Sequence, residues 1–329
     1  MKGAPGPPSE QAAILAAAGP GLAAQLESAE QRLAEIPARA GPILGPHLRR
    51  TLDAGGKRLR PMLVFLCARR GAESEPVLRA AVGVELLHTA TLVHDDVLDR
   101  SPLRRGRPTV FAAGGRLEAT AAGDLLLARA FAELTATDDP AAVRELSAAS
   151  SALVRGELMQ RADAWAAAVS VERYVERCEL KTARLFEAAC RLGALLGGSA
   201  GAGAALGRFG AAIGLAFQIF DDVLDVSGSA ERTGKQRGTD LLDGTVTLPL
   251  IFAREGDPGL RSLDLRTIDA VGAAEVCERI SSTGALERSR ERALEYVARA
   301  KTALADVELE DAGRRALELV ADGVVERYS

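Results

Sequence analysis

The sequence predicts an all-α protein, and three observations support this prediction. Of its 329 residues, 47% are hydrophobic but only 4% are aromatic, so the core must be built mostly from Ala and Leu, which are strong helix formers. From Gln11 onward, Ala/Leu segments with helical spacing follow one another almost without interruption. No stretch alternates apolar and polar residues in the manner typical of a strand. We therefore expect a single-domain helical bundle of roughly ten or more helices.

The sequence predicts one domain preceded by a short N-terminal tail. Residues 1–9 are rich in Pro and Gly, which predicts a disordered N-terminal tail. No linker divides the remainder, so residues 10–329 are expected to form one domain. The polar segments between the expected helices are Asp53–Pro61, Arg100–Thr109, Thr135–Pro140 and, the longest, Ser227–Gly244. We expect the last of these to be a mobile loop near residue 235.

Composition excludes several classes of protein. The net charge of −4 gives no sign of the concentrated basic surface that nucleic-acid binding requires. The cysteines have neither zinc-site spacing nor the pattern of a disulfide framework, and we expect reduced thiols at Cys67, Cys178, Cys190 and Cys277. The first ten residues do not form a signal peptide, and no unbroken apolar run reaches the ~18 residues of a membrane span. These features predict a cytoplasmic protein.

A short repeat is the first indication of a functional site. DDVLD occurs at Asp95–Asp99 and again at Asp221–Asp225, each time after an apolar helical run and before a polar loop that contains arginine. One such motif alone could be an exposed acidic helix end. Two copies at the ends of apolar runs favour a functional role, because partly buried carboxylates need partners.

The spacing of each motif predicts a magnesium site. Residues four apart lie on one helix face, about 6 Å apart along the axis. Carboxylates that close repel one another unless cations intervene. Their oxygens suit Mg²⁺, which is often shared with substrate phosphates. The expected metal ligands are Asp95, Asp96, Asp99, Asp221, Asp222 and Asp225.

Two basic loops complement the acidic motifs. Gly55–Pro61 reads GGKRLRP, a glycine turn that leads into a helix, so its backbone N–H groups and its cations favour a phosphate. Leu103–Thr109 reads LRRGRPT and follows the first DDVLD directly. Either loop alone is typical of a solvated surface. Next to two acidic motifs, they predict a site for a metal-bound diphosphate.

These motifs together resemble one enzyme family. GGKRLRP, ELLHTATLVHDDVLD, LRRGRPT, GEL..Q, KTARLF and FQIFDDVLD occur in the order seen in trans-isoprenyl diphosphate synthases, over about Gly55–Pro249. The resemblance implies an isoprenoid-synthase-type bundle with a central active-site cavity. It also implies a prenyltransferase that joins isopentenyl diphosphate to an allylic diphosphate head to tail, with all-trans geometry.

The resemblance carries roles to individual residues. It implies that the six aspartates hold three Mg²⁺ ions with the allylic diphosphate. The positions implied for the diphosphate of isopentenyl diphosphate are Lys57, Arg60, His88 and Arg105. Those implied for the allylic diphosphate are Arg104, Lys181 and Lys235. The expected catalytic residues are Lys181, Thr182 and Gln218, the last two beside the reacting carbons and Gln218 also in contact with substrate.

Three residues need separate comment. A lone histidine on an apolar helix is usually a core residue, but His88 lies two turns before Asp95 on the same face, and the resemblance favours a ligand role. His94 lacks that match and is expected to be structural. Many relatives carry lysine where this chain has Thr245, so the allylic site is expected to hold one cation fewer than in those relatives.

The resemblance also predicts product length. The allylic tail should run down the helix before Asp95, past Val84, Leu87, Ala90 and Thr91. Short-chain relatives place a bulky aromatic at one of the two positions nearest the aspartates, whereas Ala90 and Thr91 are small. This predicts a medium- or long-chain product of roughly six to ten isoprene units, with a farnesyl or geranylgeranyl product as the alternative. If another helix closes the tunnel for the allylic tail at a shallower depth, the product would be shorter.

Two other classes of protein share some of these features. A class I terpene cyclase would share the fold, but it guides cations with aromatic walls and has no use for GGKRLRP. A regulatory subunit usually lacks one of the motifs, and all are present here.

The resemblance implies a homodimer, with a heteromer including a small subunit as the alternative. Residues 112–132, rich in Ala, are the candidate contact segment.

Overall fold

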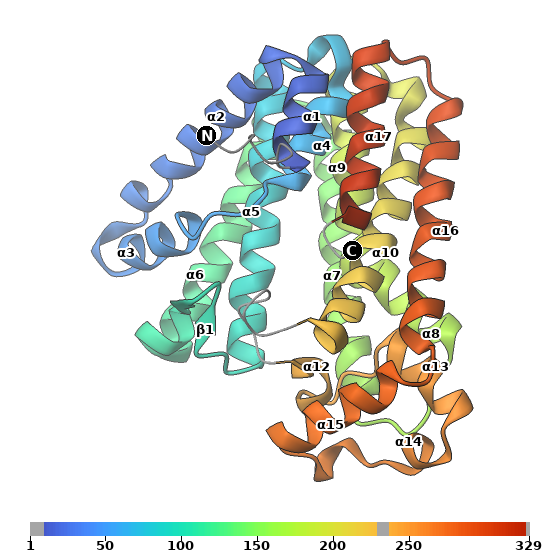
Figure 1. The fold of residues 1–329 in the computed structure, drawn as a ribbon. Coiled ribbons are helices and arrows are strands. Elements are labelled where there is room, and N and C mark those ends of the chain that lie inside the picture. The colour runs from blue at the N-terminus through green and yellow to red at the C-terminus, as the bar shows by residue number, and fades with distance from the viewer. Residues whose placement is uncertain (1–9, 229–236, 327–329) are drawn as a thin grey trace, which may run out of the picture.

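The computed structural model describes residues 10–228 and 237–326, and this part of the chain is a helical bundle, which confirms the predicted fold class (Figure 1). The expected tail, residues 1–9, and the loop around residue 235 lie outside the described residues. The division of the chain at residue 10 therefore stays a prediction. All four cysteines are buried and none forms a disulfide.

Helices account for nearly all of the regular structure. The first half contains α1 (Glu10–Ala18), α2 (Pro20–Glu35), α3 (Gly41–Leu52), α4 (Leu59–Ala68), α5 (Glu75–Leu98), α6 (Val110–Thr135) and α7 (Pro140–Asp163). The second half contains α8 (Val171–Cys178), α9 (Arg184–Leu196), α10 (Gly203–Ser227), α12 (Thr239–Leu242), α13 (Leu248–Gly256), α14 (Pro258–Ser262), α15 (Ala270–Ser281), α16 (Ala285–Ala305) and α17 (Asp311–Glu326). Short 3₁₀ turns lie at Pro37–Arg39, Arg69–Gly71, Ala200–Ala202 and Leu265–Thr267, and a π-helical turn at Glu179–Ala183 joins α8 to α9.

Four helices form the centre of the bundle. α9 packs against α4, α5 and α10, and α4 packs against α5, while α6 covers α5 and α16 covers α10 (Figure 1). The central contacts use small residues, because a Cβ at Gly193 would lie only 2.2 Å from the Val64 carbonyl oxygen. Such close backbone approach explains how a core with few aromatics still packs densely.

Two of these central helices are long and strongly apolar. By length and composition, α5 and the segment Ala200–Ser227 could each cross a bilayer. However, 67% of each apolar window is buried inside the bundle. Their hydrophobicity is therefore explained by their central position in the core.

Local structure differs from the sequence prediction in two places. The loop after the first DDVLD contains a small antiparallel hairpin, β1 (Leu103–Arg104) with β2 (Arg107–Pro108), where no strand was expected. Its two central residues, Arg105 and Gly106, both have positive φ, as a two-residue hairpin turn requires. The long polar segment after α10 was expected to be a loop throughout, but it contains the helical turn α12.

Candidate active site

The two aspartate motifs lie at the ends of two central helices, with one lysine shared between them. The first motif ends α5 and the second ends α10. Lys181, on the π-helical turn, lines the pocket that contains Asp95 and also the pocket that contains Asp221 and Asp222. The structure therefore brings together two motifs that are far apart in the sequence, as their repetition predicted.

Arginines neutralise two carboxylates of the first motif. Asp96 is buried, and its Oδ1 lies 2.8 Å from an Nη of Arg104. Asp99 forms an ion pair with Arg161 of α7. Burial is the main reason that the pKa of Asp95 is raised to about 6, with Lys181 acting in the opposite direction. A cation close to Asp95 would favour its ionised form.

A chain of hydrogen bonds fixes the second motif. The hydroxyl of Thr182 donates to Oε1 of Gln218 at 2.7 Å, and Nε2 of Gln218 donates to Oδ1 of Asp222 at 2.8 Å. The phenol of Tyr174, on α8, donates to the other oxygen of Asp222 at 2.6 Å. Asp222 and Thr182 are buried, so these bonds are shielded from water. Of the two residues predicted beside the reacting carbons, Gln218 thus bonds a predicted metal ligand directly and Thr182 is linked to it through Gln218.

The last aspartate of the second motif holds a helical turn. The carboxylate of Asp225 accepts hydrogen bonds from the backbone N–H groups of Thr239, at 3.1 Å, and Asp240, at 3.2 Å, which begin α12. Burial, followed by the charge of Asp240, raises the pKa of both Asp222 and Asp225 to about 8. Asp240 is therefore an acidic member of this site that the sequence analysis did not single out.

The donor chemistry of the site fits Mg²⁺. Carboxylate oxygens are the ligands that Mg²⁺ prefers, and it commonly takes one or two of them together with substrate phosphates. Within residues 10–228 and 237–326, no three His, Cys, Asp or Glu side chains converge closely enough to hold an ion on their own. Oxygens of a bound diphosphate would complete the coordination of ions held by these carboxylates.

The two basic loops meet, as the prediction of a shared anion site requires. A Cβ at Gly56 would lie 3.0 Å from the guanidinium of Arg105, so the glycine turn and the hairpin lie side by side. Arg60 stacks on the ring of Phe186 with 4.4 Å from its Cζ to the ring centroid, and its buried Nε has no hydrogen-bond partner. Burial lowers the pKa of Arg60 to about 10. It therefore stays charged at neutral pH and retains an N–H group for an anion.

His88 lies next to this basic cluster. Burial, and then the charges of Arg60 and Arg105, lowers its pKa well below the ordinary value. The imidazole is therefore neutral at neutral pH and has one N–H group to donate. His94, in contrast, pairs with Asp124 of α6 at 3.2 Å. That interhelical contact fits the structural role expected for it.

The remaining predicted substrate ligands have different surroundings. Lys57 is exposed on the glycine turn. Arg104 points to Asp96, as described above. Thr245, where many relatives are expected to have lysine, lines the same pocket as Asp221. Lys235 lies outside the described residues.

Sequence reasoning missed the group that holds the shared lysine. Nζ of Lys181 lies 2.5 Å from Oε2 of Glu157, on α7. Burial tends to raise the pKa of Glu157, but Lys181 and Arg161 outweigh it and the pKa is lowered. Gly156 permits the approach, because a Cβ there would lie 2.5 Å from the backbone nitrogen of Lys181. Gly156 and Glu157 begin the motif GEL..Q, which is the signal in the sequence that points to them.

The four predicted chain-length positions are not equivalent. Thr91 lines the apolar pocket that also contains Asp95 and Leu153. Ala90, in contrast, is 1% exposed and packed into the core, as are Val84 and Leu87. Their effect on product length stays a prediction.

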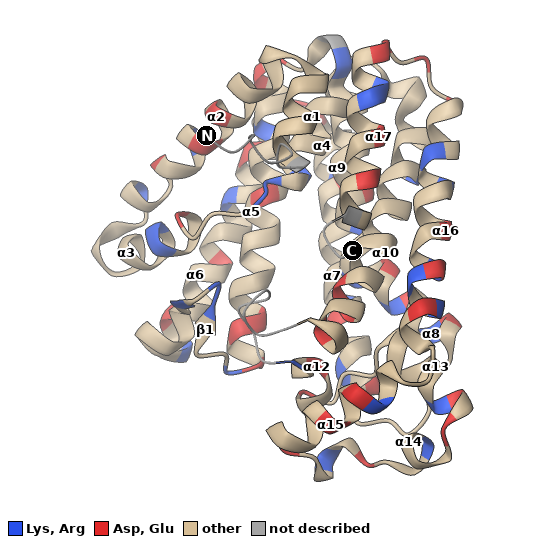
Figure 2. Cartoon of the chain, in the orientation of Figure 1, with Lys and Arg blue, Asp and Glu red and all other residues tan. Residues whose placement is uncertain are grey.

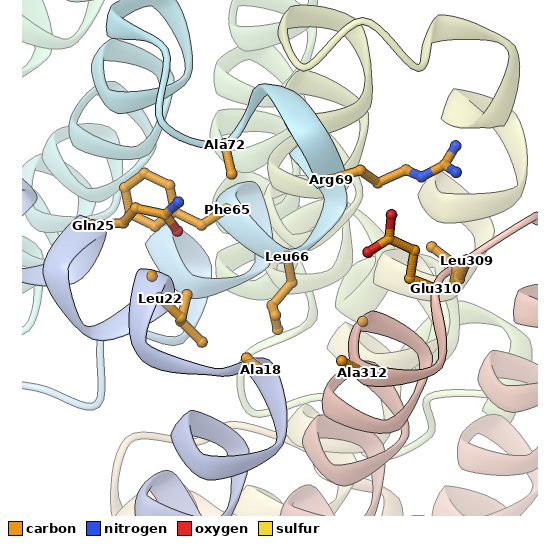
Figure 3. A pocket seen from close by; sticks show the side chains of 12 residues that line it. Ala18, Leu22, Gln25, Phe65, Leu66, Arg69, Ala72, Leu309, Glu310 and Ala312 are labelled. Carbon is orange, nitrogen blue, oxygen red and sulfur yellow. The ribbon is translucent and has the colours of Figure 1, made fainter.

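A further pocket lies away from the motifs. It is bounded by α1, α2, α4 and the start of α17 with the residues just before it, and Figure 3 shows the side chains of Phe65, Leu66 and Leu22 along its walls. Arg69 and Glu310 lie on one side of it. None of the predicted site residues lines this pocket. We therefore assign the chemistry to the end of the bundle that carries the aspartate motifs.

A helical bundle with two aspartate motifs and two basic loops at one end defines an isoprenoid-synthase-type enzyme. The chain belongs to the polyprenyl synthetase family, whose sequence model matches residues 42–277. It is 38% identical over 277 residues to heptaprenyl diphosphate synthase component 2 of Geobacillus stearothermophilus, covering 82% of this chain and 85% of the relative. It is 39% identical over 259 residues to an all-trans-nonaprenyl-diphosphate synthase of Rhodobacter capsulatus, covering 77% and 80%.

Solved structures agree with this assignment. A decaprenyl diphosphate synthase from Rhodobacter capsulatus superposes with a TM-score of 0.87 at 33% identity, covering 94% of this chain and 98% of the other. A polyprenyl synthase from Caulobacter crescentus, complexed with calcium and isoprenyl diphosphate, has a TM-score of 0.87 at 35% identity, covering 93% and 96%. The predicted family, the predicted fold and the prediction that the protein is a prenyltransferase are confirmed.

Proposed function

We propose that the protein is a Mg²⁺-dependent prenyltransferase that joins isopentenyl diphosphate to an allylic diphosphate and releases a medium- or long-chain all-trans polyprenyl diphosphate. The observation that carries the proposal is the position of Lys181, which lines the pockets of both aspartate motifs. A cation there can bind one diphosphate held between the two motifs. The expected number of Mg²⁺ ions is three.

The residues of the chain have distinct tasks in this reaction. Mg²⁺, when bound with the allylic diphosphate, would neutralise the charge of the leaving group. Lys181 and Arg104 would bind that diphosphate from the protein side, while Arg60 and Arg105 would hold isopentenyl diphosphate. The allylic C–O bond then ionises, the double bond of isopentenyl diphosphate attacks the allylic cation, and the proton lost afterwards leaves with the released diphosphate.

Thr182 and Gln218 would act on the charge of the reacting carbons. Their hydroxyl and amide dipoles are held by the bonds between them and by the bond from Gln218 to Asp222. A dipole fixed before the reaction stabilises a passing cation without reorganisation at that moment. No protein base is required, because the released diphosphate accepts the proton.

The medium- or long-chain product is supported by small residues at Ala90 and Thr91 and by the relatives named above. A geranylgeranyl diphosphate synthase of Methanosarcina mazei is also 38% identical over 289 residues, so a shorter product is the alternative. The test is to supply isopentenyl diphosphate and an allylic primer, together and singly, with Mg²⁺ or with a chelator. We expect diphosphate release only with both substrates and Mg²⁺, and a product mass of roughly six to ten isoprene units.

The outcomes of this assay separate the alternatives. Release from the allylic substrate alone would indicate a cyclase. No release would indicate a subunit that requires another chain, which the name "component 2" of the Geobacillus relative makes relevant. A product that stops at the farnesyl or geranylgeranyl stage would contradict the proposed length while leaving the chemistry intact.

For assembly, we propose a homodimer in the cytoplasm. The candidate segment 112–132 lies in α6, which packs beside α7. Next to it, Leu98, Val154 and Leu158 are 51%, 58% and 64% exposed and surround the apolar pocket beside Asp95. Leu158→Ser should shift the mass measured by light scattering from dimer to monomer. If the wild type is a monomer, the homodimer proposal is wrong and a heteromer with a small subunit is favoured.

A further inference from the structure

A short stretch between the second aspartate motif and α13 forms part of the pocket at the end of α10. We call it the α12 segment and define it as Thr239–Thr247. Its residues Asp240 and Thr245 line the pocket that also contains Lys181. Figure 2 shows acidic residues at the lower end of α10, next to α12. The position of the α12 segment therefore shapes the pocket proposed above for the allylic diphosphate.

Trp165, in the loop after α7, contacts the α12 segment at Gly244. Its backbone N–H donates to the carbonyl oxygen of Gly244 at 2.8 Å. Its ring lies against the same residue, because a Cβ at Gly244 would be only 2.3 Å from Cδ2 of the indole. Gly244 directly precedes Thr245, so both contacts fix the backbone next to a residue of the pocket.

The backbone of both residues in this contact has a positive φ, 65° at Trp165 and 72° at Gly244. This left-handed region is open to glycine, but it costs energy for a residue with a bulky side chain. Such a conformation persists only where the surrounding structure holds it, and it is common at functional sites. The conformation of Trp165 therefore needs a cause beyond local propensity, and the contact with Gly244 supplies one.

Two arginines fix the chain just after each member of this contact. Nη2 of Arg177, a side chain that is 3% exposed, donates to the carbonyl oxygen of Val246 at 2.6 Å. Nη1 of Arg254, on α13, donates to the carbonyl oxygen of Ala166 at 3.2 Å. The loop after α7 and the α12 segment are therefore both tied to neighbouring helices where they meet.

We propose that Trp165 is a positioning residue for prenyl transfer, which keeps Asp240 and Thr245 of the α12 segment in the pocket of the allylic diphosphate. The inference rests on the proposed function. Among the described residues, those that line this pocket do not include Trp165, so it acts through Gly244. The pocket that contains Arg105, proposed for isopentenyl diphosphate, is formed by α3, α5 and the hairpin. The contact therefore affects one substrate more than the other.

A purely structural role of Trp165 would have a different kinetic signature. Loss of stability reduces the folded fraction of the enzyme, which lowers the apparent kcat and leaves the KM of both substrates unchanged. A displaced α12 segment instead weakens the binding of the substrate that it contacts. Residues that orient a binding group in this way typically contribute roughly ten- to hundred-fold.

The test is steady-state kinetics of prenyl transfer, with each substrate varied while the other is saturating. Trp165→Ala should raise the KM for the allylic substrate by roughly ten- to hundred-fold and leave the KM for isopentenyl diphosphate unchanged. Trp165→Phe keeps an aromatic ring beside Gly244 and should restore most of the wild-type KM. Thermal unfolding, measured alongside, shows whether each variant is folded.

Gly244→Ala tests the same contact from the other side. Its Cβ would collide with the indole, so this change should raise the KM for the allylic substrate in the wild type. The increase should be much smaller in Trp165→Ala, where the ring is absent. The cost of a positive φ at Gly244 is present in both backgrounds, so it cancels in this comparison.

The matched control is Phe252→Ala. Phe252, on α13, is also a partly buried aromatic residue with an arginine over its ring, and its loss should leave both KM values unchanged. The inference is overturned if Trp165→Ala changes neither KM or both equally, if Gly244→Ala has the same effect in both backgrounds, or if the control raises the allylic KM as much. A wild type that forms no product from the two substrates would instead overturn the proposed function, so the two failures are distinguishable.

Discussion

The phenol of Tyr174 donates a 2.6 Å hydrogen bond to the carboxylate of Asp222, and both side chains are buried. The bond joins α8 to the second aspartate motif on α10. It leaves the other oxygen of Asp222 bonded to Gln218, so the carboxylate is held from two sides. A predicted metal ligand is therefore oriented by residues that do not themselves need to contact the ion.

Tyr174→Phe should raise the Mg²⁺ concentration needed for half-maximal activity. The substitution removes only the hydroxyl group, and a hydrogen bond to a charged partner contributes about 1.5–3 kcal/mol. We expect a roughly ten- to hundred-fold change in metal dependence or turnover, and thermal unfolding is measured alongside because loss of this buried bond also lowers stability. Tyr296→Phe, at a residue that stacks near Arg299 and Arg292, is the control. The same Mg²⁺ dependence in wild type and Tyr174→Phe would show that the bond does not position Asp222.

Asp95→Ala or Asp221→Ala should abolish turnover while the fold survives. Each residue leads one of the two motifs, and removing it takes away a carboxylate that the bound cations need. Product formation and circular dichroism, measured together, check this. Asp306→Ala is the control, because Asp306 pairs with Arg208 on the surface. Near-normal activity with unchanged magnesium dependence in either variant would rule out the two-motif model.

Arg105→Ala should weaken the binding of isopentenyl diphosphate much more than the binding of the allylic substrate. Lys181→Ala should weaken the binding of the allylic substrate more. The basic loops hold Arg105 next to Gly56, while Lys181 lies between the aspartate motifs. Each lost contact to a charged group costs about 1.5–3 kcal/mol, or roughly ten- to a hundred-fold. The KM for each substrate, determined with the other saturating, is the measurement. If both variants affected the two substrates equally, the assignment of separate sites would be incorrect.

Ala90→Phe and Thr91→Phe should shorten the product. Thr91 lines the apolar pocket beside Asp95, so an aromatic ring there would fill it. Ala90 is packed into the core, where added volume costs about 1–3 kcal/mol, so its thermal stability must be measured alongside. Mass spectrometry of the products checks both variants. If folded Thr91→Phe still makes an unchanged long product, α5 does not limit the length of the product.

Arg58→Ala should destabilise the fold far more than Arg208→Ala. Arg58 precedes α4 and forms ion pairs with Glu30 and Glu85, the latter at 2.8 Å between two nearly buried side chains. Leaving Glu85 without its partner should cost about 3–5 kcal/mol. The pair of Arg208 with Asp306 is exposed, and such pairs contribute about 0–1 kcal/mol. Equal midpoints in urea unfolding would show that the Arg58 pairs contribute no stability.

Some features follow from the sequence by itself because their cause is local. Helical periodicity and the Ala/Leu composition predicted the fold, since helix formation depends on contacts a few residues apart. The repeated DDVLD and the basic loops predicted a diphosphate site because each motif carries its chemistry within five to seven residues. The small side chains at Ala90 and Thr91 predicted a long product only through the resemblance to the family, and their effect on product length stays a prediction.

Other features were decided only by the tertiary structure. The bond between Tyr174 and Asp222, the pair of Lys181 with Glu157 and the cap that Asp225 provides for α12 join residues far apart in the chain. Whether such side chains meet depends on how α7, α8 and α10 pack, and no local pattern encodes that packing. A carboxylate in a sequence motif can equally hold a metal ion, an arginine or a helix end, and its neighbours in the folded bundle determine which of these it contacts.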